Sequence, residues 1–290
     1  MTDGAPVSGL DHVLIGVRDL EGARRAYQAL GFVCTPRGRH IGWGTANYCI
    51  MFARDYIELL GIVDASQFTN NLDVFLARRE GLMGVAFASA DAEASRTAFR
   101  ARGLAAEAPH ALARDLELPE GTVQPCFRLV HPDAEATPAL PAFVCEHLTP
   151  ELMRRPEWLD HPNSARGILA VTTVVDDPPA LAPAYARTFG EGAVTLTDAV
   201  LTLHLGHAAF TFANADDFDL LFDGVGADAA SAPPYIAALT VAVDDIARAA
   251  AVLDRAGIAA EAAGGQSLIV APERAAGVVL EFRAERLDRP

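Results

Sequence analysis

The feature that most constrains the fold is a pattern that this chain repeats four times. Each copy opens with an apolar strand, followed by an acidic residue that can cap a helix and by an amphipathic helix that ends at a glycine. Three more strands, separated by turn residues, complete the copy. The opening strands begin at Leu10, Leu82, Ile168 and Ile236, the acidic residues are Asp19, Asp91, Asp177 and Asp245, and the glycines are Gly31, Gly103, Gly190 and Gly257. This recurrence predicts four equivalent modules.

One such unit cannot bury the face of its own sheet, whereas two units can form a curled sheet around a shared hollow. We therefore predict an α+β fold in which four βαβββ modules pair into two curled-sheet domains. The first domain is expected over residues 8–148, with modules 10–62 and 82–148. The second is expected over residues 167–286, with modules 168–213 and 236–283. Residues 149–166, which contain prolines and a short helical stretch, are expected to form the linker.

Composition excludes several classes of function. Apolar residues make up 51% of the chain, enough for a large core. The formal charge of −15 argues against a nucleic-acid partner, which needs clustered cations. No apolar run is long enough to cross a membrane, and the N-terminus does not resemble a secretion signal, so a cytoplasmic protein is expected. The scattered cysteines, without CxxC spacing, are expected to be buried apolar residues rather than metal ligands or disulfides.

The segments LDHVLIGVRDLEGA and YIEL, together with the fourfold repeat, resemble the vicinal oxygen chelate superfamily. That superfamily includes glyoxalase I, bleomycin-resistance proteins and extradiol ring-cleaving dioxygenases. The stretch RHIGWGTANYCIMFARDYIELLGI is similar to the narrower group of glyoxalase-like domain proteins. The superfamily resemblance covers nearly the whole chain, and the narrower one covers mainly the first module.

The resemblance implies a metal site whose ligands come from the first and last strands of two paired modules. In the first module these positions are His12 and Glu58, and in the second they are Gly84, where a histidine would stand, and Glu146. One imidazole and two carboxylates suit a divalent ion such as Zn, Mn, Ni or Fe(II). His147 would supply a second imidazole if the register of its strand differed by one residue. Glu58 or Glu146 could leave the metal to act as a catalytic base.

Further residues are candidates for the walls of the cavity. Aromatic and polar side chains around the segment GRHIGWGTANY suit a small oxygenated or partly apolar ligand. A histidine in the predicted linker could fold back over the opening. The alternative for each of them is a solvated side chain or one that packs a turn. These candidates are Arg39, His40, Trp43, Asn47, Tyr48 and His161.

The second domain lacks the ligand pattern. Its equivalent first-strand positions are Ala170 and Ala238, and its last-strand positions are Thr211 and Glu281. A single carboxylate holds a metal poorly, so this domain is expected to be structural or to shape the cavity mouth or a dimer contact. An ordinary extradiol dioxygenase, with its two-histidine site in the second pair of modules, is therefore less favoured.

Two main hypotheses for the function follow. The first is a metal-dependent enzyme of lyase or isomerase type that acts on a small oxygenated molecule, and the second is a non-catalytic protein that sequesters a small molecule in the same cavity. An extradiol-type dioxygenase, or an interaction role through the second domain, is a weaker alternative. The expected partner is a small molecule, neither nucleic acid nor membrane, and the expected assembly is a monomer or a homodimer.

Overall fold

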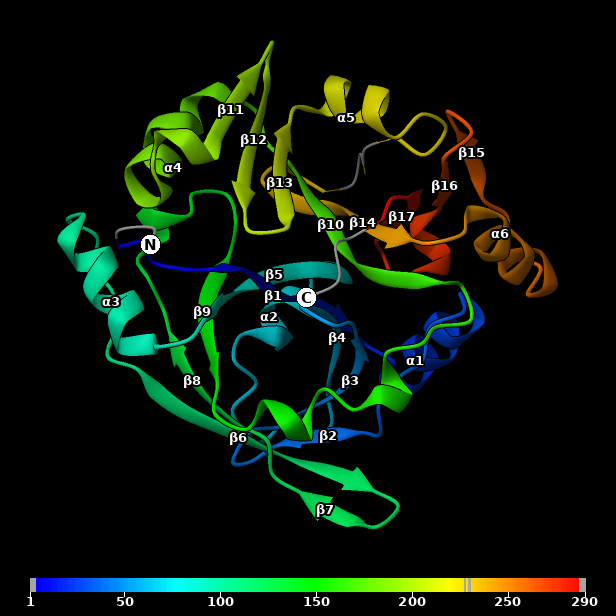
Figure 1. The fold of residues 1–290 in the computed structure, drawn as a ribbon, viewed down its shortest axis with the longest axis horizontal. Helices are drawn as coiled ribbons and strands as arrows, with labels where there is room; N and C mark the ends of the chain where they lie inside the picture. Colours follow the sequence, from blue (N-terminus) through cyan, green and yellow to red (C-terminus); the bar gives the residue numbers. More distant parts are fainter. Residues whose placement is uncertain (1–3, 227, 229–230, 287–290) are drawn as a thin grey trace.

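The computed structural model describes residues 4–226, 228 and 231–286, and it contains two curled sheets, one from each half of the chain (Figure 1). The predicted α+β class with two domains of paired βαβββ modules is confirmed. No helix among the described residues is both long and apolar enough to cross a membrane.

The first sheet has nine strands in the order β2-β3-β4-β1-β5-β9-β8-β6-β7, and an additional pairing of β2 with β6 closes it into a barrel. The opening strands of its two modules, β1 and β5, are antiparallel neighbours at its centre. Each is parallel to the last strand of its own module, β4 or β9. The strands are β1 Gly9–Val17, β2 Gly38–His40, β3 Thr45–Met51, β4 Tyr56–Ile62, β5 Gly81–Ser89, β6 His110–Leu118, β7 Gly121–Val123, β8 Cys126–Val130 and β9 Ala142–His147.

The second sheet has eight strands in the order β11-β12-β13-β10-β14-β17-β16-β15, and among the described residues no pairing closes its edges. Its central strands β10 and β14 repeat the arrangement of β1 and β5. The strands are β10 Ala165–Val174, β11 Val194–Thr197, β12 Val200–Leu205, β13 Ala208–Ala213, β14 Tyr235–Val243, β15 Glu261–Ala263, β16 Ser267–Val270 and β17 Val279–Ala284.

The helices begin largely where the sequence predicts. Asp19, Asp91 and Asp245 each accept a backbone hydrogen bond at the first turn of the following helix, as N-caps do. Asp177 differs, because it does not cap the helix of its module; its carboxylate accepts from the amide of Ala180, in the 3₁₀ turn Pro179–Leu181 that precedes that helix. The helices are α1 Leu20–Ala29, α2 Leu72–Leu76, α3 Ala92–Ala101, α4 Ala182–Phe189, α5 Ala215–Leu221 and α6 Ile246–Arg255.

The outer faces of the two sheets share one hydrophobic core, so each sheet keeps an inner face of its own. Ring contacts between Phe87 and Phe210 and between Phe32 and Phe282 join the two halves, with centroids 5.5 and 5.6 Å apart. The connecting segment after β9 places Met153 and Trp158 in the separate cluster inside the first barrel. The linker therefore completes the interior of the first domain as well as leading to the second.

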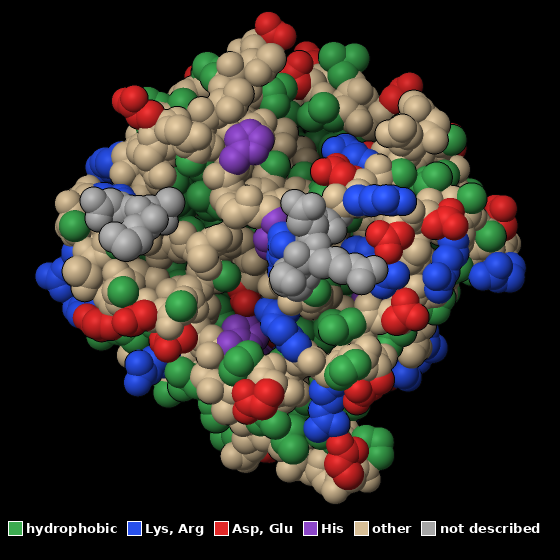
Figure 2. Space-filling view, in the orientation of Figure 1, with side chains coloured by type: hydrophobic (Ala, Val, Ile, Leu, Met, Phe, Trp, Pro, Cys, Tyr) green, Lys and Arg blue, Asp and Glu red, His purple; other side chains and the backbone are tan. Residues whose placement is uncertain are grey.

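Charged side chains are interspersed on the face drawn in Figure 2, where acidic and basic groups alternate and apolar side chains are visible in the hollows between them. The cysteines within the described part of the chain are free thiols. Cys49 and Cys145 are buried, as the sequence predicts for all four, whereas Cys34 and Cys126 are only partly buried.

Candidate functional site

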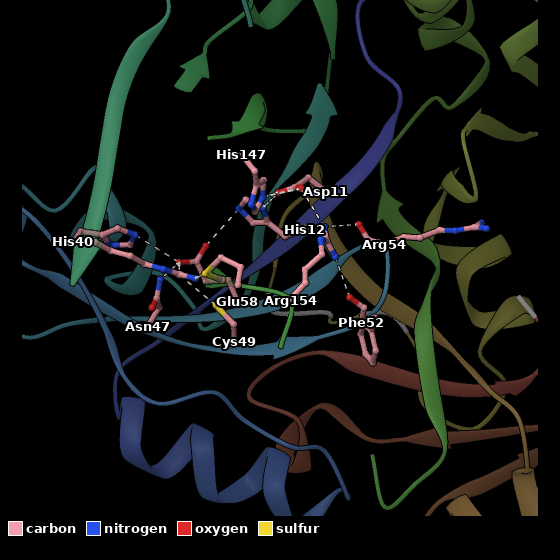
Figure 3. A network of polar contacts seen from close by, with 12 residues as sticks. Asp11, His12, His40, Asn47, Cys49, Phe52, Arg54, Glu58, His147 and Arg154 are labelled. Atoms are coloured by element: carbon pink, nitrogen blue, oxygen red, sulfur yellow. Dashed lines mark hydrogen bonds and ion pairs between the residues drawn. The ribbon is translucent and has the colours of Figure 1, made fainter. Parts of the chain in front are cut away.

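A β-bulge on the first strand places two neighbouring polar residues inside the barrel. Asp11 and His12 follow each other on β1, where successive side chains would ordinarily face opposite sides of the sheet. The register between β1 and β5 shifts between Leu10 and His12, which leaves Asp11 as the extra residue of the bulge. Both side chains are almost completely buried, at 3% and 4% exposure. Figure 3 shows them together at the centre of a polar network.

Asp11 holds the ring of His12. One carboxylate oxygen of Asp11 lies 2.7 Å from Nδ1 of His12, and Asp11 also accepts a hydrogen bond from Nε2 of His147 at 3.0 Å. Burial acts to raise the pKa of Asp11, but the charge of His147 and the hydrogen bonds from both imidazoles outweigh it and hold the pKa well below its usual range. An ionised Asp11 keeps a proton on Nδ1 of His12, which leaves Nε2 free to face the interior.

Glu58 on β4 is buried, and its two carboxylate oxygens have different partners (Figure 3). Oε1 accepts a hydrogen bond from Asn47 and lies 3.8 Å from Nε2 of His40 and 3.9 Å from Nη1 of Arg114. Oε2 faces His12. Burial acts to raise the pKa of Glu58, but the facing histidines, Arg114 and Asn47 outweigh it, so the net pKa is lowered and the carboxylate is ionised at neutral pH.

The working edge of the site is formed by Nε2 of His12 and Oε2 of Glu58, which lie 3.5 Å apart. Two ligands that bind one ion at about 2.1 Å lie roughly 3–3.5 Å from each other, so this separation fits a shared divalent ion. Both groups are also oriented from behind, as metal ligands usually are: His12 by Asp11, and Glu58 by Asn47 and Arg114. The donors therefore fit an open site with two protein ligands.

The second module contributes neither of the other two ligand positions that the resemblance implies. A Cβ atom on Gly84 would lie 2.9 Å from the carbonyl oxygen of Pro141, so the backbone there leaves no room for a histidine. In the first module the last-strand ligand pairs with Leu14, and the corresponding pairing in the second module joins Ala86 to Phe143. Phe143, not Glu146, therefore occupies the matching place, and its ring lines the cavity.

Glu146 does not converge with His12 and Glu58, in contrast to the prediction from the sequence. Glu146 lies on the outer side of β9, where it accepts a hydrogen bond from the amide of Ala92 at the start of α3. The physical reason is the alternation of side chains along a strand, which turns Cys145 and His147 inward instead. His147 does reach the network, although it contacts Asp11 rather than Glu58.

A second set of donors that could hold a metal ion consists of Asp11, His12 and Cys145, whose ligand atoms lie within 4.8 Å of one another. Burial raises the pKa of the Cys145 thiol well above its usual value, so the sulfur is protonated. A thiol binds metals poorly until it loses its proton. Asp11 is already hydrogen-bonded to the two imidazoles at ordinary distances, which need no ion between them. The pair formed by Nε2 of His12 and Oε2 of Glu58 therefore suits a divalent ion better than this second set does.

The site opens onto a small cavity of about 50 Å³ inside the barrel. Its polar wall carries His12, His40, Glu58 and Arg114, and its apolar wall includes Leu14, Tyr56, Leu60, Phe127, Leu129 and Phe143. Trp43 forms part of the wall and packs edge-on against the exposed ring of Phe68. Nδ1 of His40 is hydrogen-bonded to Thr45, and burial lowers the pKa of His40 to about 4, so this imidazole is neutral.

The remaining candidates lie away from the cavity. The hydroxyl of Tyr48 donates to Glu21 of α1, on the outer face of the sheet, and Arg39 is exposed to solvent. His161 is fully buried, where Nδ1 accepts from the amide of Val33 and Nε2 donates to the carbonyl of Met51. These contacts give His161 a structural position rather than one over the opening.

Sequence reasoning missed three residues of the site: Asp11, Arg114 and Arg154. Arg114 is 2% exposed, donates to the sulfur atoms of Cys49 and Met153, and has an Nε with no protein partner. Arg154 lies 3.9 Å from Asp11 and donates to three successive carbonyls, of Phe52, Ala53 and Arg54. The available signal was an acidic residue inside the apolar run LDHVLIGV; the two arginines gave none.

Comparison with known proteins supports the fold and a family. The sequence model of the family described as "Glyoxalase-like domain" matches residues 10–189. A hypothetical protein from Staphylococcus aureus superposes with a TM-score of 0.67 at 12% identity, covering 95% of this chain and 99% of that one. A variant of 4-hydroxymandelate synthase from Streptomyces coelicolor gives a TM-score of 0.57 at 13% identity, covering 98% and 95%.

A xylose isomerase-like TIM barrel/4-hydroxyphenylpyruvate dioxygenase fusion protein gives a TM-score of 0.51 at 13% identity, covering 98% of this chain and 50% of the fusion. At such low identities these structures share the fold with this chain and nothing more specific. No curated protein matches the sequence.

Proposed function

Because this chain belongs to the glyoxalase-like domain family, we propose that it is an enzyme that acts on a small oxygenated molecule inside the first barrel. The proposed reaction is of lyase or isomerase type, in which a proton moves at a carbon next to a carbonyl group. The observation that carries the proposal is the 3.5 Å edge between Nε2 of His12 and Oε2 of Glu58, with each group held from behind by other buried side chains.

His12 and Glu58 are proposed to hold a divalent ion, such as Zn, Mn, Ni or Fe(II). Bound there, the ion would polarise the oxygen atoms of the substrate and stabilise the negative charge that develops on them. The fit rests on the separation of the two donors and on their orientation by Asp11 and Asn47.

The chain's own residues have separate roles in this proposal. Asp11 keeps the proton of His12 on Nδ1. Asn47 and Arg114 contact Oε1 of Glu58, so the ionised Oε2 is the atom that would hold the ion, and it would take up a proton from carbon only after leaving that ion. Arg114 also lines the cavity, where its guanidinium places a positive charge that would stabilise negative charge on an oxygen of the substrate.

The size of the cavity limits the substrate. About 50 Å³ has room for only a few water-sized groups, since roughly 10–15 Å³ is needed to hold one water. A larger molecule therefore requires movement of the wall where Trp43 packs on the exposed Phe68. The apolar side chains opposite the polar edge favour a substrate with a short carbon skeleton and adjacent oxygens.

The test is metal binding by matched variants. Protein purified without chelator is analysed for metal, and any bound metal is then removed. Thermal unfolding is measured with and without added Mn²⁺, Zn²⁺ and Ni²⁺. Binding at about 100 times Kd stabilises the native state by about 2.7 kcal/mol, which shifts the melting temperature upward. We expect this shift in the wild type, and its loss in His12→Gln and Glu58→Gln.

Glu146→Gln is the matched control, because it makes the same change on the outer face of β9. This control should keep the metal shift. The proposal is overturned if the metal shift is absent in the wild type, or if it survives in Glu58→Gln.

A second candidate is a non-catalytic protein that sequesters a small molecule in this cavity. It is favoured by the absence of donors at Gly84 and Phe143, and by the contact of Arg114 with Glu58, which already provides that carboxylate with a positive charge. Under this alternative, organic ligands raise the melting temperature and divalent ions do not.

A further inference from the structure

A row of threonines crosses four neighbouring strands of the second sheet. Thr195 on β11 pairs with Thr202 on β12, Thr202 pairs with Thr211 on β13, and Thr211 pairs with Thr172 on β10. Residues directly opposite each other on paired strands project from the same face of a sheet. Their neighbours in the chain, such as Phe210, belong to the core on the outer face, so the row lies on the inner face.

This inner face lines a cavity of about 440 Å³, much larger than the cavity of the first barrel. Thr172, Thr202 and Thr211 line it, while Thr195 continues the row outside it in an exposed position. The place corresponds to the candidate site of the first domain. Thr211 pairs with Thr172 as Glu58 pairs with Leu14.

The hydroxyls of these three lining threonines have no hydrogen-bond partner in the described part of the chain, and none is sealed in the interior. A threonine hydroxyl both donates and accepts a hydrogen bond. Three of them in a row, spaced by the distance between neighbouring strands of about 4.8 Å, match a ligand that carries several hydroxyl groups along a short chain or ring.

The charges around the cavity favour a neutral ligand. Arg283, the cation in the wall, is paired with Glu281 at 2.8 Å, and Glu281 also accepts from Thr240. His207 is paired with Asp55 of the first domain. An anionic ligand would thus find no unpaired arginine among the described lining residues, whereas Glu285 would repel it. Apolar residues such as Val200 and Phe222 can cover carbon atoms.

We propose that the inner face of the second domain is a binding site for a small neutral polyhydroxylated molecule, with the hydroxyls of Thr172, Thr202 and Thr211 as its recognition groups. The site is independent of the ion and of the chemistry proposed for the first domain, because none of these residues belongs to that cavity. It gives the second domain a ligand of its own.

The experiment uses the full chain labelled with ¹³C at threonine methyl groups. Erythritol is the neutral probe and inorganic phosphate is the anionic one. We expect saturable shifts of the Thr172, Thr202 and Thr211 methyl signals with erythritol, and no shift of Thr195. Thr202→Val and Thr211→Val keep the shape of the side chain and its β propensity while removing the hydroxyl, and each should weaken binding at least tenfold.

Two further variants keep the test decisive. Thr195→Val is the matched control, because it removes a hydroxyl from the same row outside the cavity, and it should bind as the wild type does. Thr211→Ser retains the hydroxyl and should restore binding relative to Thr211→Val. The proposal is overturned by non-saturable or absent shifts with erythritol, by equal affinity in Thr211→Val and wild type, or by binding of phosphate alone.

Discussion

Oδ2 of Asp11 lies 2.7 Å from Nδ1 of His12, although the two residues are neighbours on one strand. The bulge between Leu10 and His12 brings both side chains to the same interior, and the pair then has a fixed orientation toward Glu58. The β-bulge thus lets Asp11 orient the buried ring of His12 so that Nε2 faces Glu58.

Asp11→Asn should destabilise the protein by about 3–5 kcal/mol, because it removes one partner of a buried charged network. Urea denaturation at pH 7 measures the loss, and ¹⁵N NMR of His12 should report a changed tautomer. The same change at the exposed Asp198 should cost less than about 0.5 kcal/mol.

Because the pKa of Asp11 is lowered in the folded state, the stabilisation from its ionised carboxylate is present above the unfolded pKa and disappears as the pH falls through the lower folded value. An Asp11→Asn variant as stable as Asp198→Asn contradicts this account.

Gly84→Ala should destabilise the protein by about 1–3 kcal/mol, since the added Cβ would lie 2.9 Å from the backbone oxygen of Pro141. Gly192→Ala is the control, because a Cβ there meets no atom within 4 Å. Chemical denaturation compares the two. Equal stability of both variants would show that the second module has room for a ligand at position 84.

His161→Phe should cost about 2–4 kcal/mol, because it leaves the amide of Val33 and the carbonyl of Met51 without their buried partner. Burial lowers the pKa of His161 to about 4, as it does for His40. Between pH 4 and the unfolded pKa of about 6.5, the unfolded chain binds the extra protons, so stability falls as the pH is lowered through this window.

Each such histidine adds up to about 1.4 kcal/mol per pH unit to the slope of the unfolding free energy against pH. The total slope should therefore be shallower in His161→Phe than in the wild type. Unfolding free energies measured from pH 7.5 to 4.5 test this. His204→Gln, a change at an exposed histidine, should retain the wild-type slope. A wild type whose stability is flat across the window would refute the assignment of neutral, buried imidazoles.

His207→Phe should destabilise the contact between the two domains by about 3–5 kcal/mol. Asp55 of the first domain is fully buried, and its carboxylate receives Nε2 of His207 at 2.5 Å and the amide of Ile168 at 3.1 Å. Calorimetry should show a lower melting temperature or two separated transitions. His204→Phe, three residues earlier on an exposed position, should leave the melting curve nearly unchanged.

The architecture could be predicted from the sequence because the strands and helices of each module are marked by local sequence signals. The apolar strands, the caps at Asp19, Asp91 and Asp245 and the terminal glycines are local signals, and each recurs in the structure. His12 and Glu58 were chosen because the family resemblance implies ligands on the first and last strands of a module, and the structure brings the two side chains together.

The register of the second module was not accessible in the same way. Phe143 rather than Glu146 stands at the matching place, since the pairing of β5 with β9 is set by contacts between strands far apart in the chain. Side chains alternate between the two faces of a strand, so Glu146, an odd number of positions from Phe143, faces the opposite side.

The repeat and the pairing of modules were determined by the sequence alone, because helix caps, strand periodicity and chain turns depend on neighbouring residues. The choice of His12 and Glu58 as donors also needed the resemblance to a known superfamily. The bulge at Asp11, the positive charge of Arg114 beside Glu58 and the threonine row of the second sheet were decided only by the tertiary structure. The bulge and the position of Arg114 depend on strand register in the first sheet, which arises from contacts between residues tens to more than a hundred positions apart. The threonine row depends on the registers of β10 to β13, because only these registers place the four side chains on one face.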